Sequence, residues 1–297
     1  MTSPFKAGYV AIVGRPNVGK STLMNQLIHE KLAIVSPKPQ TTRHRILGIL
    51  TGKNYQAIFL DTPGLIKPNY LLQEAMMETV SKTMKDADLI LMMLDASDIR
   101  AEDELVLQAV SQSQRPKCLL INKADKVPKL NILPIIDRFR NDAQFKEIIP
   151  ISALKNDGLE VLLEQILKYL PEGVPFYPPD MVSDEPERFF VAELIREQIF
   201  MHFGDEIPYA TAVQIEQFEE RPGRKDFIRA VISVERSSQK GILIGKQGQA
   251  LKKIGSAARV QIEQFLERPV YLQLDVRVQK KWRKDPAQVK RFGYQSK

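Results

Sequence analysis

One short segment limits the possible folds of this chain more than any other. The segment Gly14–Ser21 fits the pattern G-x-x-x-x-G-K-S, follows an apolar run at Tyr9–Val13 and precedes a helical pattern at Thr22–His29. Between a strand and a helix, such a glycine-rich loop wraps backbone N–H groups around phosphate oxygens, and the positive end of the helix adds to the attraction. The segment therefore predicts a phosphate-binding loop in an α/β domain.

Two side chains of this loop have distinct predicted roles. Lys20 is placed to reach the β- and γ-phosphates of a nucleoside triphosphate, and the Ser21 hydroxyl is placed to bind Mg²⁺. We assign to nucleotide binding the residues Gly14, Arg15, Pro16, Asn17, Val18, Gly19, Lys20, Ser21 and Thr22.

The first 170 residues repeat this pattern of strand and helix. Four further runs of four to six mostly apolar residues have the character of strands buried on both faces, and amphipathic stretches separate them. Alternating strands and helices predict a doubly wound, mostly parallel sheet with helices on both faces, an α/β fold. The four runs are Ala57–Leu60, Leu89–Leu94, Cys118–Ile121 and Ile148–Ile151.

Polar segments after two of these strands indicate which base is bound. Guanine presents two donors on one edge, N1–H and the exocyclic amine, and the carboxylate of Asp125 can accept both; adenine lacks that pair. The backbone N–H of Ala153 is expected to contact the guanine oxygen. We assign to guanine recognition Asn122, Lys123, Asp125, Ser152, Ala153 and Leu154, which predicts GTP or GDP as the ligand.

A third polar segment, Asp61-Thr62-Pro63-Gly64, follows the strand Ala57–Leu60. The Asp61 carboxylate can hold the hydration shell of Mg²⁺, and the Gly64 N–H can sense the γ-phosphate and move when it leaves. All of these segments lie just past the carboxyl ends of predicted strands, where open α/β sheets bind their ligands.

A proline-rich stretch marks a domain boundary. Pro171–Pro179 holds four prolines and a glycine in nine residues, which excludes a helix or a central strand. We therefore predict a nucleotide-binding domain at residues 1–172, a semi-rigid linker at 173–186 and a second domain at 187–297.

Charge is distributed unevenly between these parts. Residues 178–220 carry a net charge of −9, whereas residues 221–297 carry +13. A basic block of that size suggests a polyanion as partner, most simply nucleic acid, although a solvated surface is the alternative.

The basic block contains the motif Gly245-Lys-Gln-Gly248. The surrounding elements are predicted in the order α-β-β-α-α-β, with helices at Gln249–Ile254 and Ser256–Glu267. This α+β arrangement resembles the type II KH module, whose G-x-x-G loop clamps the backbone of single-stranded nucleic acid. By that resemblance we assign to RNA binding Ile244, Gly245, Lys246, Gln247, Gly248, Lys252 and Lys253. Ile244 is the candidate for the base groove, with a place in the core as its alternative, and a solvated helix face is the alternative for Lys252 and Lys253.

The basic tail offers further candidates. A tryptophan flanked by cations can stack on a base while lysines meet phosphates, although it can equally pack the tail onto the domain. The candidates are Lys280, Lys281, Trp282, Arg283 and Lys284.

The nucleotide motifs taken together resemble the translation-factor class of GTPases, and Pro39–Gly48 resembles the first switch of the Era family. By that resemblance Thr42 is the switch threonine that binds Mg²⁺ with Ser21 and Asp61. Thr41 is the competing choice, because spacing alone does not separate the two.

Two residues bear on the catalytic rate. Leu65 stands where Ras-like GTPases carry the glutamine that orients the attacking water, so catalysis is expected to be slow and mostly electrostatic. Asn17 matches an asparagine that helps bind a catalytic K⁺ in related GTPases, while a loop-capping role is the alternative. The catalytic candidates are Asn17, Lys20, Thr42, Asp61 and Gly64.

The chain resembles the Era family from end to end. The resemblance implies a monomeric GTPase that binds 16S ribosomal RNA near its 3′ end, acts in assembly of the small (30S) ribosomal subunit and associates loosely with the inner membrane. A lone cysteine, Cys118, fits the reducing cytoplasm, and no apolar run is long enough to span a membrane. An RNA chaperone that GTP merely stabilises, with little turnover, is the alternative.

Overall fold

The apolar runs of the first domain assemble into one sheet in the computed structural model, which describes residues 4–140, 144–204 and 206–294. The strand order is β2-β3-β1-β4-β5-β6, and neighbouring strands are parallel except that β2 runs antiparallel to β3. The strands are β1 (Lys6–Val13), β2 (Ile46–Gly52), β3 (Tyr55–Asp61), β4 (Leu89–Asp95), β5 (Lys117–Asn122) and β6 (Glu147–Pro150).

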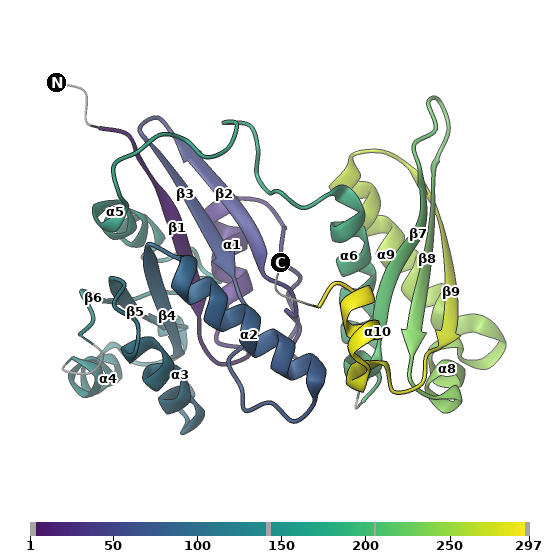
Figure 1. The fold of residues 1–297 in the computed structure, drawn as a ribbon, viewed down its shortest axis with the longest axis horizontal. Coiled ribbons are helices and arrows are strands. Elements are labelled where there is room, and N and C mark those ends of the chain that lie inside the picture. The colour runs from purple at the N-terminus through teal and green to yellow at the C-terminus, as the bar shows by residue number, and fades with distance from the viewer. Residues whose placement is uncertain (1–3, 141–143, 205, 295–297) are drawn as a thin grey trace.

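Helices cover both faces of this sheet (Figure 1). The apolar faces of α1 (Lys20–Ile28) and α5 (Leu159–Tyr169) pack on one side. The other side is covered by α2 (Leu71–Asp86), α3 (Glu102–Ser111) and α4 (Ile132–Phe139). The doubly wound α/β prediction is confirmed.

The edge strand β2 was missed by the sequence analysis, which took part of it as switch loop. Its outer edge is covered by the proline-rich linker, because the Ile49 N–H donates to the Val182 carbonyl at 2.9 Å and the Ser183 hydroxyl donates to the Leu47 carbonyl at 2.6 Å. The buried side chain of Gln56 also accepts the backbone N–H of Phe176 at 2.8 Å. The linker is therefore fastened to the first domain along β2.

The second domain is a three-stranded sheet with helices on one face. The strand order is β7-β8-β9, with β7 and β8 antiparallel and β8 and β9 parallel. Apolar residues of the long helices α6 and α9 form a core with the sheet. The elements are α6 (Glu187–His202), α7 (Ile207–Ala210), β7 (Ala212–Glu219), β8 (Asp226–Val234), α8 (Ser237–Ile244), α9 (Gln249–Leu266), β9 (Val270–Val278) and α10 (Pro286–Arg291).

The helices around Gly245–Gly248 correct one prediction. The loop lies between α8 and α9, and α9 is a single helix rather than two that break near Gly255. A Cβ at Gly255 would lie 3.3 Å from Leu274 Cδ1, tighter than most such contacts. This glycine therefore lets α9 approach β9 closely instead of ending a helix.

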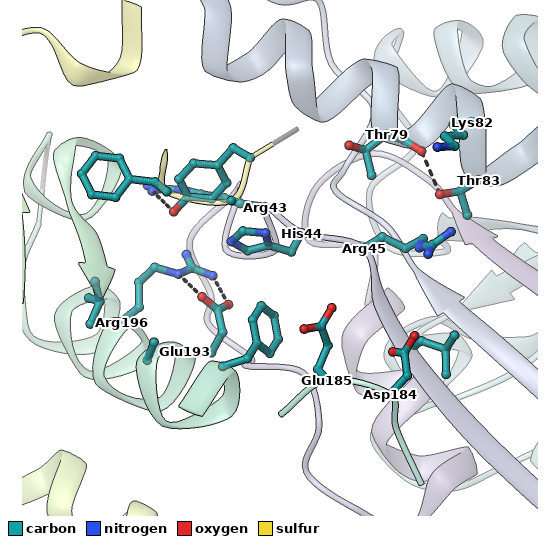
Figure 2. Close-up of a pocket in the computed structure, with 17 residues that line it drawn as sticks. Arg43, His44, Arg45, Thr79, Lys82, Thr83, Asp184, Glu185, Glu193 and Arg196 are labelled. Carbon is teal, nitrogen blue, oxygen red and sulfur yellow. Dashed lines mark hydrogen bonds and ion pairs between the residues drawn. The ribbon is translucent and has the colours of Figure 1, made fainter. Parts of the chain in front are cut away.

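The two domains meet across α2 and the C-terminal segment (Figure 1). An apolar cluster joins Leu72 and Met76 of α2 to Trp282, Val289 and Tyr294. Beside it lies an interdomain cavity of about 260 Å³, into which His44 points, facing the ion pair of Glu193 and Arg196 (Figure 2). No helix in the described part of the chain is both long and apolar enough to cross a membrane.

Candidate functional site

A cleft of about 820 Å³ opens at the carboxyl ends of the parallel strands. The loops after β1, β3 and β5, together with residues 34–42, form its walls. Several predicted residues lie behind the lining instead, among them the fully buried Val18 and Thr62. The predicted residues that line the cleft are Arg15, Pro16, Asn17, Gly19, Lys20, Ser21, Thr22, Thr42, Gly64, Asn122, Lys123, Asp125, Ala153 and Leu154.

The phosphate-binding loop curls around the amino group of Lys20. Its Nζ donates to the carbonyl oxygens of Gly14 at 3.1 Å and Arg15 at 2.9 Å. Burial lowers the pKa of Lys20 to about 8, and the neighbouring Asp61 carboxylate opposes that shift. The positive charge is thus concentrated in a part of the cleft where water screens it weakly, as phosphate binding requires.

Three oxygen-bearing side chains converge beside Lys20. Ser21 Oγ donates to Asp61 Oδ2 at 2.6 Å and lies 2.9 Å from Thr42 Oγ1. Asp61 Oδ1 is buried with no hydrogen-bond partner among the described residues, and burial raises the pKa of Asp61 to about 6. A buried carboxylate oxygen without a partner is costly, and oxygen ligands suit Mg²⁺. The set therefore fits a magnesium ion.

Hydrogen bonds of the two hydroxyl groups distinguish Thr42 from Thr41 as the candidate metal ligand of the first switch. Thr42 joins Ser21 and Asp61, whereas Thr41 Oγ1 donates to the Lys38 carbonyl at 2.8 Å. The hydroxyl of Thr41 is thereby used within its own loop, so the structure favours Thr42 as the metal ligand.

The side chain of Asn122 connects three loops of the cleft through hydrogen bonds. Its Nδ2 donates to the Val18 carbonyl at 2.7 Å, and its Oδ1 accepts the Ala153 N–H at 2.9 Å. The Ala153 N–H, which we expected to contact guanine, is therefore used by Asn122 in this structure, and that expectation is not supported. Asn122 acts by positioning, whereas the exposed carboxylate of Asp125 is presented to the cleft.

Two further predicted residues face different partners from those expected. Lys123 Nζ bonds Asp95 Oδ2 at 2.5 Å and the Asn17 carbonyl at 2.8 Å, so it braces the phosphate loop. The Arg15 side chain pairs with Asp103 at 3.1 Å in a nearly fully buried contact, and its Nη2 lies 3.4 Å from Asp98 Oδ2 at the wall of the cleft. The Arg15 guanidinium is therefore engaged by two carboxylates, and no sequence pattern indicated the contact with Asp103.

The segment that follows β3, residues 62–65, passes very close to the phosphate loop. A Cβ at Gly64 would lie 2.5 Å from the backbone nitrogen of Pro16, so glycine is required there. The next residue, Leu65, donates its N–H to the Gly14 carbonyl at 3.0 Å and packs against the apolar cluster beneath α2. Its side chain offers no group that could orient water.

A second groove, of about 500 Å³, lies between α9 and β9 in the other domain. Gly248 and Lys252 line it as predicted, and Lys246 and Gln247 are exposed at the loop tip. Ile244 does not line the groove, because it packs against the domain core. The groove residues that the sequence analysis missed are Lys225, Leu251, Gly255, Ser256, Arg259, Val270, Tyr271, Leu272 and Leu274.

One signal could have identified part of that set. Lys252, Gly255, Ser256 and Arg259 follow the spacing i, i+3, i+4, i+7, which places them on one face of a helix. Small residues at the centre of that face let a strand approach, and the cations at its ends can meet phosphates.

The tail prediction needs a correction at Trp282. Its indole is fully buried in the interdomain cluster, and Nε1 donates to the Ala210 carbonyl at 2.8 Å. Arg283 is paired with Glu235 at 2.6 Å. In this structure Trp282 joins the domains and is not accessible to a base, so we withdraw its assignment to RNA binding; Lys280, Lys281 and Lys284 are exposed.

These two sites define the class of protein. A cleft with a phosphate loop, a metal-binding set and a guanine-selecting carboxylate stands beside a domain with an exposed G-x-x-G loop. Residues 9–123 match the family model described as a 50S ribosome-binding GTPase, and residues 206–283 match that of the KH domain. The protein is a P-loop GTPase joined to a KH domain.

Comparison with similar proteins identifies the family within this class. The chain is 46% identical over 292 residues to GTPase Era of Syntrophus aciditrophicus, covering 98% of this chain and 95% of the relative. It is 46% identical over 293 residues to GTPase Era of Lactobacillus helveticus, covering 99% and 97%. The chain belongs to the Era family of GTPases, and it hydrolyses GTP.

Two solved structures resemble the whole chain. One is a variant of Aquifex aeolicus Era bound to GDP and AlF4⁻, with a TM-score of 0.95 at 44% identity, covering 98% of this chain and all of that one. The other is Era in complex with MgGDPNP and nucleotides 1506–1542 of 16S ribosomal RNA, with the same score, identity and coverage. Guanine nucleotide and Mg²⁺ are thus the ligands of this family's cleft.

Proposed function

We propose that this GTPase binds the 3′ region of 16S ribosomal RNA as a single strand and that GTP hydrolysis times a step in assembly of the small ribosomal subunit. The observation that carries the proposal is the groove beside the G-x-x-G loop, bordered by Lys252 and Arg259, in the same chain as the GTP cleft. A similar Era structure contains that RNA segment. A cytoplasmic location, loose membrane association and a monomeric state stay predictions.

Hydrolysis in this cleft depends on charge placement. Lys20 would offset the charge on the phosphate oxygens, and we expect the Gly64 N–H to donate to the γ-phosphate. Ser21, Thr42 and Asp61 would hold Mg²⁺, which when bound neutralises charge on the β- and γ-phosphates. Because Leu65 cannot orient the attacking water, the intrinsic rate is expected to be low.

Direct contacts between residues 31–38, which lead into the first switch, and the KH domain support a timing role. Lys38 Nζ donates to the carbonyls of Phe200 at 2.5 Å and of Phe203, at the end of α6. Glu197, also on α6, accepts the Val35 N–H at 3.0 Å and pairs with Lys31 at 2.6 Å. A nucleotide that changes the position of this switch must therefore change how the KH domain is held, which is the coupling that allostery requires.

A titration of single-stranded RNA carrying the 16S 3′ sequence tests this function. The full chain is titrated in GTP and in GDP, and we expect affinities that differ between the two states. The double variant Lys246→Asp and Gln247→Asp should weaken RNA binding while sparing GTP binding, because both side chains are exposed in the loop between α8 and α9 of the KH domain and neither lines the cleft. Unchanged RNA affinity in the variant would refute the groove assignment.

A measurement of GTP turnover distinguishes a timing GTPase from the alternative, an RNA chaperone that GTP only stabilises. A timing GTPase must produce GDP at a rate that responds to RNA, whereas a chaperone that GTP only stabilises need not. Steady-state GDP release measured with and without the RNA decides between them.

We further propose that K⁺ assists hydrolysis at Asn17. Its Nδ2 donates to the Pro37 carbonyl at 2.7 Å, so the phosphate loop and the carbonyls of the first switch lie together there. Amide and carbonyl oxygens suit a monovalent cation, while the same hydrogen bond also fits a loop-capping role. Faster hydrolysis in potassium than in sodium buffer, lost in Asn17→Ala, supports the ion; equal rates remove it.

A further inference from the structure

An aromatic pair made of the exposed Tyr271 and the half-buried Phe227 lies at the edge of the groove between α9 and β9. Tyr271, on the edge strand β9, lines the groove and is 58% exposed. Its ring stacks on that of Phe227, its register partner on β8, with centroids 5.9 Å apart and planes 14° from parallel. An exposed aromatic ring beside a basic groove is suited to stacking on a nucleobase.

The rings of Tyr271 and Phe227 extend from the groove to the other face of the sheet. Leu272 and Leu274 also line the groove and pack toward the helices. Phe227 alternates with the buried Ile228, so its ring lies on the sheet face away from the helices. Tyr271 therefore belongs both to the groove and to the neighbouring face, where a strand leaving the groove would pass.

Cations surround this edge. Arg221 lies over the Phe227 ring, with Cζ 4.8 Å from the centroid. Lys225 lines the groove next to Tyr271, and Arg224 is exposed at the same β7–β8 turn. Aromatic faces for bases beside cations for phosphates are the two components of single-strand binding sites.

We propose that Tyr271 and Phe227 form a stacking platform for a nucleobase of single-stranded RNA that lies just outside the stretch clamped by the G-x-x-G loop. That loop clamps about four nucleotides in KH modules, so the platform receives a flanking base. Stacking on an aromatic face is tolerant of sequence, so this subsite extends the bound length of RNA more than its sequence specificity. The platform rests on the proposed RNA-binding function.

RNA length provides the test. The full chain and Tyr271→Ala are compared on a four-nucleotide RNA that fills the groove and on a twelve-nucleotide RNA that extends beyond it. One stacked base is worth about 1–3 kcal/mol, so we expect Tyr271→Ala to bind the longer RNA roughly 5- to 150-fold more weakly. Binding of the shorter RNA should change by less than about 2-fold.

Three further variants show whether a loss of RNA affinity comes from lost stacking or from a weakened sheet. Tyr271→Phe should bind as the parent does, because the ring is kept. Tyr271→Leu keeps apolar packing on Phe227 but should lose the affinity, which separates stacking from a weakened sheet. Gln273→Ala, two residues along the same strand, is the matched control and should leave both affinities unchanged.

A fluorescent base locates the contact. With 2-aminopurine placed at successive positions of the longer RNA, quenching at one flanking position should be present in the parent and absent in Tyr271→Ala. Equal losses on short and long RNA, or full affinity in Tyr271→Leu, would show that the pair only stabilises the sheet. Failure of the parent chain to bind either RNA would instead overturn the proposed function.

Discussion

Arg43 of the first switch donates from Nη1 to the carbonyl oxygen of Thr211 in the KH domain at 2.7 Å. Its Nη2 donates to the carbonyls of Pro208 at 2.9 Å and Tyr209 at 3.1 Å. The preceding residue, Thr42, lies at the metal-binding set. A single peptide bond thus separates the nucleotide site from the contact that holds the second domain.

Replacing Arg43 with Ala should loosen the domain junction. Three carbonyls, two of them buried, would lose a charged donor, and a loss of about 3 kcal/mol in interdomain stability is expected. Small-angle scattering should show a larger radius of gyration, while GTP binding persists because the side chain faces away from the cleft. Lys53→Ala, exposed at the β2–β3 turn, is the control. An unchanged radius would contradict the role.

Removing the charge of Lys20 should prevent nucleotide binding or turnover. In Lys20→Ala the phosphates lose the buried ammonium, and a reduction of roughly 100-fold or more is expected in GTP affinity or hydrolysis. Fluorescent nucleotide titration and phosphate release measure the two. Lys126→Ala, an exposed residue at the cleft, should change neither much. Normal turnover in Lys20→Ala would refute the phosphate-loop assignment.

Changing Asp125 to Asn should alter base preference and leave the fold intact. The carboxylate accepts two guanine donors, whereas an amide can donate to the oxygen that xanthine carries in place of the amine. We expect GTP affinity to fall by roughly 100-fold or more and the preference to move toward XTP. Competition of GTP, XTP and ATP for the cleft measures this, and retained GTP selectivity would count against the assignment.

Asn122→Ala should behave differently from the Asp125 variant. It leaves the buried Val18 carbonyl and Ala153 N–H without their partner, at about 1–3 kcal/mol each. We expect a lower melting temperature and weaker binding of GTP, GDP and XTP alike, since the loops are displaced rather than the base contact changed. A loss confined to guanine nucleotides would show that Asn122 contacts the base.

Acidification should weaken the domain junction through His44. Burial lowers the pKa of His44 to about 4; Glu193 and the Gly293 carbonyl oppose that shift, and Arg196 and Arg43 reinforce it. Because the folded-state pKa lies below the unfolded value, the stability is complete above about pH 6.5 and is lost as pH falls toward 4. Between pH 7 and pH 5 the loss is about 2 kcal/mol.

Thermal unfolding of the parent and of His44→Phe across that range tests the assignment. Phenylalanine keeps a ring between Tyr294, which stacks on His44 at 4.5 Å, and Phe189, but it cannot bind a proton. The stability of the variant should fall less between pH 7 and pH 5. Parallel pH profiles would mean that other groups cause the acid sensitivity.

Residues of the candidate site could be predicted from the sequence where their chemistry depends on their neighbours along the chain. Lys20, Ser21 and Asp125 line one cleft, and Asp61 lies behind its lining, 2.6 Å from the Ser21 hydroxyl. We assigned them to one site because each lies at or after the end of a strand, and parallel strands bring their carboxyl ends to one edge. The choice between Thr41 and Thr42 was not predictable, since both fit the spacing and only the position of their hydroxyl groups separates them.

By itself the sequence determined the α/β domain and the KH domain, and it predicted the boundary between them and the two ligand-binding loops. Each depends on backbone conformations and periodicities set within some ten residues, which a linear pattern carries. Tertiary structure alone decided that Trp282 is buried, that Ile244 packs against the core and that Arg43 reaches Thr211. Those contacts join distant segments through shape and burial, and no local spacing records them.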